Sequence, residues 1–176
     1  MTPTDAPPVR PATPADVDEL VRLRALMFAE MGEPAAAVAE PGWRAATAAF
    51  TRAGLADGTV AGAVVDAPGA PGRLVASGLG VVVRRAPGPG VPSGRFGHVQ
   101  SVVTEREWRR RGLAGAVVRV LLDWFVAHGV RSVDLHATAS GDRVYRALGF
   151  AEPEHPELRW RAPLGHLTGG SSTVGP

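Results

Sequence analysis

Three consecutive arginines followed by a glycine form the segment of this chain that is best suited to bind an anion. The segment consists of Arg109, Arg110, Arg111, Gly112, Leu113 and Ala114. It separates an apolar, β-branched stretch at residues 98–104 from a long amphipathic stretch at residues 112–128. A helix that starts here leaves its first backbone N–H groups without internal partners, at the positive end of its dipole. Such a helix start can hold a phosphate, and Gly112 would let it approach the backbone closely.

The segment does not match the two common nucleotide-binding patterns. The G-x-G-x-x-G fingerprint is missing after the strand, and a P-loop needs a lysine, which this chain lacks. An ordinary strand-to-helix turn carrying a solvated cluster of arginines therefore stays open as an alternative on composition alone.

The elements that would position this segment follow from apolar periodicity and from turn residues. The sequence predicts helices at residues 13–30, 33–57, 112–128 and 141–148. It predicts strands at residues 9–12, 59–65, 74–83, 98–104, 130–137, around 150 and at 158–162. This order indicates an α/β chain with a mixed sheet of about six to seven strands, antiparallel in its first half and parallel around the helix at 112–128.

Composition narrows the class of protein. A chain of 176 residues suggests one domain, expected at residues 9–163, between a flexible arm at 1–8 and a flexible tail at 164–176. The absence of cysteine excludes disulfides, cysteine–zinc sites and a cysteine nucleophile. No apolar run approaches the length of a membrane span and residues 1–14 hold no apolar signal region, so we expect a cytoplasmic protein.

The quoted segments resemble a known family. The strand and the arginine turn resemble the acetyl-CoA motif [RQ]-x-x-G-x-[GA] of the GNAT superfamily. The residues that carry this resemblance are Val102, Val103 and Thr104 in the strand, and Arg109, Gly112 and Ala114 in the turn. A second match follows, in which the strand at 133–137 leads to a short helix with Tyr145 that ends at Gly149 and Phe150. The resemblance extends over about residues 9–162, although Thr138 stands near the place of a family asparagine.

The resemblance implies an acetyl-CoA-dependent N-acetyltransferase that moves the acetyl group directly to a primary amine in a ternary complex, without a metal. In the family, the strand before the arginine turn splays from its parallel neighbour, and the pantetheine arm lies in the gap. The implied cofactor contacts are Val102, Val103, Thr104, Arg109, Arg110, Arg111, Gly112, Leu113, Ala114 and Gly115.

The resemblance also implies the catalytic groups. Tyr145 matches the general acid that protonates the leaving thiolate; the alternative is a core aromatic residue. His98 lies six residues before Thr104, and in a regular strand the two side chains would lie on the same face. A histidine there could relay a proton from the amine. The alternative is a half-buried histidine with a structural role in the strand. Glu30, Glu33 and Glu40 fall in the region that covers the acceptor side in the family.

Two other functions stay open at this point. A non-catalytic CoA or acyl-CoA sensor would use the same cofactor site, although the tyrosine argues for turnover. Nucleic-acid binding through the arginines is disfavoured by a net charge of only +2 and by few interleaved aromatic residues. The expected partner is a small-molecule or peptide amine, with neither nucleic acid nor membrane. Exposed strand edges of this fold often pair between subunits, which makes a homodimer a further expectation.

Overall fold

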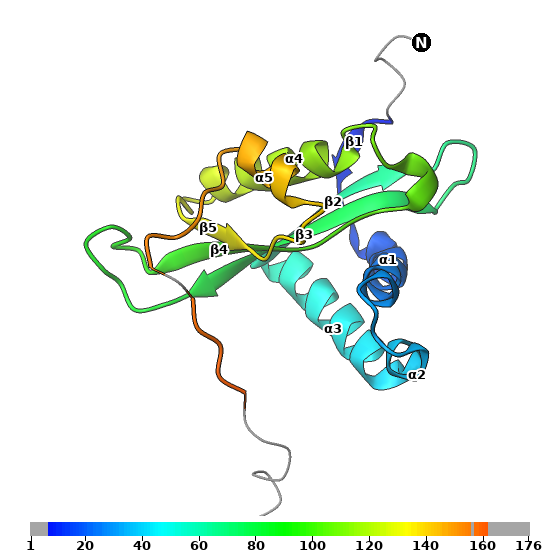
Figure 1. Ribbon diagram of the computed structural model, residues 1–176, viewed down its shortest axis with the longest axis horizontal. Coiled ribbons are helices and arrows are strands. Elements are labelled where there is room, and N and C mark those ends of the chain that lie inside the picture. The colour runs from blue at the N-terminus through cyan, green and yellow to red at the C-terminus, as the bar shows by residue number, and fades with distance from the viewer. Residues whose placement is uncertain (1–6, 156, 162–176) are drawn as a thin grey trace, which may run out of the picture.

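A sheet of five strands runs through the protein, with helices on both of its faces (Figure 1). The computed structural model describes residues 7–155 and 157–161. The strands are β1 Val9–Pro11, β2 Val60–Asp66, β3 Leu74–Arg84, β4 Arg95–Thr104 and β5 Val133–Leu135, and they lie side by side in this order. The pairs from β1 to β4 are antiparallel, and β4 pairs with β5 in parallel.

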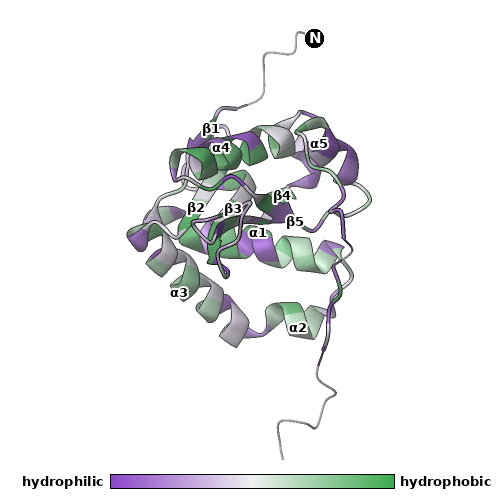
Figure 2. Ribbon diagram, turned by 90° about the vertical axis from the view of Figure 1, so that its left-hand side faces the viewer, coloured by the Kyte–Doolittle hydropathy of each residue, from purple (hydrophilic) through white to green (hydrophobic). Residues whose placement is uncertain are grey.

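The helices divide between the two faces of the sheet. They are α1 Val17–Glu30, α2 Ala35–Ala39, α3 Pro41–Asp57, α4 Leu113–Ala127 and α5 Asp142–Ala147, with short 3-10 helices at Pro14–Asp16 and Arg106–Trp108. Helices α4 and α5 cover one face, and α1 and α3 cover the other (Figures 1 and 2). No helix among the described residues is long and apolar enough to cross a membrane.

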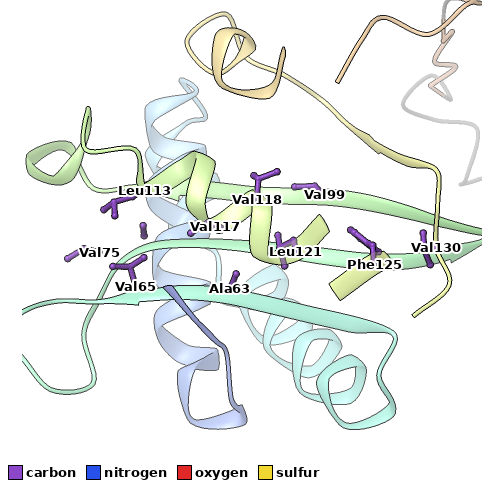
Figure 3. Packing of buried hydrophobic residues seen from close by; sticks show 11 residues of the cluster. Ala63, Val65, Val75, Val99, Leu113, Val117, Val118, Leu121, Phe125 and Val130 are labelled. Carbon is purple, nitrogen blue, oxygen red and sulfur yellow. The ribbon is translucent and has the colours of Figure 1, made fainter. Parts of the chain in front are cut away.

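Helix α4 forms the larger part of the core. Its buried residues Leu113, Val117, Val118, Leu121 and Phe125 point toward the strands (Figure 3). The strands beneath it are glycine-rich: a Cβ placed at Gly97 would come within 2.8 Å of Phe125, and one at Gly78 within 2.7 Å of Val117. The missing side chains let α4 pack closely on the sheet.

The predicted α/β class, the antiparallel first half and the parallel pair are confirmed, but the sheet has five strands, fewer than the six to seven expected. Residues 150 and 158–161 are not in strands, and residue 162 lies outside the described residues. The physical reason is the shortness of β5, which pairs through three residues only and offers little edge to a further strand. The side chains of Leu158 and Trp160 are 90% and 80% exposed, so burial does not hold this segment on the sheet.

The region expected as one helix at 33–57 is two helices. Glu40 separates them because its carboxylate accepts hydrogen bonds from the backbone N–H groups of Gly42 and Trp43 and so caps α3, while Pro41 begins that helix. The expected arm at 1–8 is described only at Pro7 and Pro8, and the expected tail at 164–176 lies outside the described residues.

Candidate functional site

A gap opens between β4 and β5 because they pair over only part of their length. The parallel pairing runs from Gly97 opposite Val133 to Val99 opposite Leu135 and then stops, while β4 continues to Thr104. The backbone of residues 100–104 therefore has no strand partner from β5. An extended ligand can hydrogen-bond to such an edge as an added strand does.

A β-bulge at Ser101 changes the orientation of β4 where the gap begins. Ser77 pairs with Val103 and Leu79 pairs with Gln100, so Gly78 faces two residues of β4. Ser101 takes a positive φ of 54°, which is uncommon for a residue other than glycine.

The bulge changes which side chains of β4 lie on each face of the sheet, so the alternation before Ser101 does not continue after it. Before it, Val99 packs in the core under α4; after it, Val103 packs with Leu20 and Leu23 of α1. A regular strand would place these valines on the same face. The expectation that His98 and Thr104 share a face, which assumed a regular strand, is therefore wrong.

The arginine turn brings free backbone amides to the end of the gap. Arg110 and Gly112 both have positive φ, of 63° and 79°, and Gly112 directly precedes α4. The first intrahelical bond runs from the N–H of Ala116 to Gly112, which leaves the N–H groups of residues 113–115 without backbone partners among the described residues. These amides can receive a pyrophosphate.

The arginine side chains contribute unequally to this turn. The guanidinium of Arg109 pairs with Glu30 of α1 and donates to the carbonyl of Thr104 at 2.9 Å. Arg111 lies over the ring of Trp108, with 4.6 Å between its Cζ and the ring centroid. Two of the three side chains are thus engaged with the protein, which leaves anion binding mainly to the backbone.

Thr104 supplies a further polar group at the gap. Its Oγ1 atom is buried and has no hydrogen-bond partner among the described residues. A buried hydroxyl without a partner costs free energy unless a ligand or a water molecule satisfies it. The free edge of β4, this hydroxyl and the amides at the start of α4 follow one another along the chain from β4 into α4.

Tyr145 lies on α5, beside the start of α4. A Cβ at Gly115 would lie 3.5 Å from the side chain of Val144, the residue before the tyrosine. The ring packs at 6.1 Å from that of Phe150 and against the core under α4. Burial raises the pKa of the Tyr145 phenol, so it stays protonated at neutral pH and can donate a proton.

His98 belongs to a hydrogen-bonded group on the opposite face of β4. Its Nδ1 contacts the carboxylate of Asp134, which also accepts from Arg85 at 2.9 Å. Burial alone would raise the pKa of Asp134, but the hydrogen bonds from His98 and Arg85 outweigh it and lower the pKa. A carboxylate on Nδ1 leaves Nε2 as the free basic nitrogen. His136 lies next to this pair, with 5.5 Å between the two histidine rings.

A cavity lies between the helices α1, α2 and α3 and extends to the face of the sheet that α1 and α3 cover. It consists of two hollows of about 330 and 340 Å³ that share Arg24, Trp43 and Thr47 in their walls. One hollow extends to Glu33, and the other reaches Gln100 of β4, where the gap begins. Of the three glutamates expected on this side, only Glu33 lines the cavity; Glu30 pairs with Arg109 and Glu40 caps α3.

Sequence reasoning missed three groups of this site: Arg24, Ser101 and Asp134. A signal for the bulge was present, because the apolar residues Val99, Val102 and Val103 break the two-residue period of a strand. The pairing of Asp134 with His98 depends on the register of the parallel strands, in which these two residues are opposite each other. No local pattern predicts that register.

Comparison with known proteins agrees with this geometry. The family model for the acetyltransferase (GNAT) family matches residues 20–150. A search of curated protein sequences found no match. A solved GCN5-related N-acetyltransferase from Ralstonia eutropha is similar, with 24% identity, a TM-score of 0.73, and coverage of 86% of this chain and 97% of that one.

Two further solved structures share the fold. A predicted acetyltransferase with acetyl-CoA from Clostridium acetobutylicum has 21% identity and a TM-score of 0.74, over 86% of this chain and 94% of that one. Glucosamine-6-phosphate N-acetyltransferase from Arabidopsis thaliana has 16% identity and a TM-score of 0.64, over 86% and 96%. The family match, spanning the splayed strands and the helix start that they lead into, shows that this chain belongs to the GNAT family and is an N-acyltransferase.

Proposed function

We propose that this protein transfers the acetyl group of acetyl-CoA to a primary amine within a ternary complex. The observation that carries the proposal is the sequence of three groups that have no partner among the described residues: the β5-facing edge of β4 at 100–104, the Thr104 hydroxyl, and the amides of residues 113–115. The C. acetobutylicum structure of the same fold is described with acetyl-CoA, which supports this choice of donor.

The proposed reaction forms an amide and releases a thiol. Acetyl-CoA supplies a thioester, the carbonyl carbon of which is attacked by the neutral amine. An alkylammonium has a pKa near ~10.4, so few amines are neutral at pH 7 without a base. His98 accepts the proton that the amine loses as the C–N bond forms, and Asp134 orients it. Tyr145 gives its proton to the sulfur as the C–S bond breaks, and solvent then returns a proton from His98 to Tyr145.

The cavity and the gap would let the amine and acetyl-CoA reach the reaction site from different directions. The cavity reaches Gln100, two residues after His98, from the face covered by α1 and α3, and the arginine turn follows the other end of β4. The amine would enter from the cavity, and CoA would lie along the gap. This arrangement supports direct transfer, since both substrates can be present at once without a covalent enzyme intermediate.

The test is a calorimetric titration of acetyl-CoA into wild type and Gly112→Val, followed by a thiol-release screen over a panel of amines. The protein has no cysteine to contribute a background thiol. Binding that is weakened in the variant, together with amine-dependent thiol release, is the expected result. Binding without release from any amine would favour a CoA sensor, and no binding would refute the cofactor site.

A further inference from the structure

We propose that the amine acceptor also carries an anionic oxygen group, a carboxylate or a phosphate, which is bound by Arg24 in the cavity between α1, α3 and the sheet. The inference rests on the proposed function, because it takes this cavity as the acceptor site. It adds a substrate class and a specificity-determining residue.

Arg24 differs from the other half-buried arginine of α1. Arg22 is fully paired, with hydrogen bonds of 2.7 Å to Glu19 and 2.8 Å to Glu105. Arg24 donates to the hydroxyl of Ser101 and lies over the ring of Phe28, 5.0 Å from its centroid. Among the described residues it has no carboxylate within salt-bridge distance.

A half-buried guanidinium without a counter-ion is costly. Burial lowers the pKa of Arg24, which reflects the unfavourable removal of its charge from water. A single hydroxyl satisfies one of the several N–H donors of a guanidinium and none of its charge. The remaining donors therefore favour a ligand that supplies negatively charged oxygen atoms, which guanidinium groups bind through paired hydrogen bonds.

The cavity directs the anion toward the sheet. In the hollow that reaches Gln100, Arg24 is the only charged residue among the described residues that line it. The other hollow also contains Glu33, whose carboxylate would repel an anion and keep it near Arg24. Because Arg24 contacts Ser101 beside the start of the gap, the anion and the reactive amine would be only a few bonds apart.

The remaining walls indicate the body of the acceptor. Phe28 and Trp43 meet edge to face, with 5.5 Å between their centroids, and both line the first hollow. These rings favour an apolar or planar group. The acceptor class is therefore an amino acid or an amino phosphate with an apolar portion.

The first test measures binding without acetyl-CoA, so that it does not depend on turnover. The probes are 3-phenylpropanoate, phenyl phosphate and the neutral 2-phenylethanol, titrated into the full chain by ligand-observed NMR. We expect at least one anion to bind about tenfold or more tighter than the alcohol, as charge-assisted hydrogen bonds do. The tighter anion distinguishes carboxylate from phosphate. Equal binding of the alcohol and both anions would overturn the inference.

Three variants separate recognition from structural support. Arg24→Gln should abolish the preference for the anion, and Arg24→Lys should retain part of it. Ser101→Ala removes the hydroxyl that Arg24 contacts but keeps the cation, so anion binding should persist. If Ser101→Ala lost as much anion affinity as Arg24→Gln, Arg24 would act by holding the bulge, and the inference would fail. Thermal melting checks that each variant folds; the wild-type comparison of anion with alcohol needs no variant.

A turnover experiment separates this inference from the proposed function. Thiol release is compared between phenylalanine and 2-phenylethylamine, and between 1-amino-2-phenylethylphosphonate and 2-phenylethylamine; the members of each pair share the apolar body and differ in the anionic group. Both the acetyl transfer and the anion site are supported if wild type releases more thiol with the anionic amine of a pair and Arg24→Gln shows no such preference. Anion binding without any release contradicts the proposed acetyl transfer to these amines and leaves the anion site standing.

Discussion

At the scale of single residues, Tyr145 is the group whose environment most directly predicts a kinetic effect. Tyr145→Phe keeps the ring and its packing but removes the proton donor, so kcat should fall by about 10²-fold or more while acetyl-CoA affinity stays unchanged. Burial raises the pKa of the phenol, so wild-type activity should not decline through its ionisation until the pH exceeds about 10. Steady-state kinetics and calorimetry on both proteins measure this, and a phenylalanine variant with undiminished kcat would exclude the role.

Asp134 makes a prediction at the same scale, as a positioning residue that acts through His98. Because it contacts Nδ1, Asp134→Asn should lower kcat by less than His98→Gln, which we expect to cost about 10²-fold. In the double variant the losses should not add, since both residues serve one proton transfer. Additive losses in the double-mutant cycle would mean that Asp134 acts elsewhere. Arg85→Gln is the control, because it removes the other partner of Asp134 and leaves His98 paired.

At the scale of elements, the turn before α4 predicts a loss of acetyl-CoA binding at one position and little change at another, two residues away. Gly112→Val places a β-branched residue at a φ of 79°, which costs about 1–3 kcal/mol and should weaken acetyl-CoA binding by about tenfold or more. Arg110 already has a φ of 63°, so Arg110→Gly relieves strain and should bind within about threefold of wild type. Calorimetry compares the two. Arg110→Ala keeps the strained backbone and separates the loss of charge from the change of conformation.

The contact between α4 and the sheet makes a second prediction at this scale. A Cβ at Gly97 would lie 2.8 Å from Phe125 and 2.9 Å from Val133, so Gly97→Ala should destabilise the fold by about 1–3 kcal/mol. Urea unfolding monitored by circular dichroism measures the change. Gly97→Ala combined with Phe125→Leu should recover part of the loss, because the smaller side chain leaves room for the methyl group. A lack of any recovery would indicate a cause other than crowding.

At the scale of the whole molecule, a network of ion pairs ties β1 to the helical layer and to β2. Arg10 donates to Asp16 at 2.8 Å and to Asp66 at 2.7 Å. The hydrogen bond from Arg10 is the main cause that lowers the pKa of Asp16 to about 2 from a usual value of 3.8. A lowered carboxylate pKa stabilises the folded state above pH 4, and this stabilisation is lost as the pH falls toward 2.

Asp16→Asn should therefore cost about 2 kcal/mol of unfolding free energy at pH 7, because each unit of pKa shift corresponds to about 1.36 kcal/mol. The difference between wild type and variant should shrink between pH 4 and pH 2. Denaturant unfolding at pH 7 and pH 3 measures it. Asp18→Asn, in an exposed ion pair with Arg52, is the matched control and should have little effect at either pH. A difference that stays constant with pH would rule out the ion pair as its source.

Periodicity and turn residues alone determined much of this protein. The amphipathic pattern of residues 112–128 predicted α4 to within one residue at each end, because apolar residues at helical spacing form one buried stripe. Glycines after the helices predicted their ends, as Gly129 with a φ of 71° confirms. The arginine turn and the helix start were also visible in the sequence, since a local motif forms its own geometry.

Only the tertiary structure decided which side chains lie around the gap between β4 and β5. The bulge at Ser101 reverses the face of β4, and the register of β4 with β5 sets His98 opposite Asp134. Arg24 and Ser101 are 77 residues apart and meet only after α1 packs on the sheet. Contacts of this kind depend on strand register and helix packing, in which a shift of one residue turns every side chain to the other face. The sequence thus determined where α4 begins, and long-range packing decided which side chains line the gap and the cavity beside it.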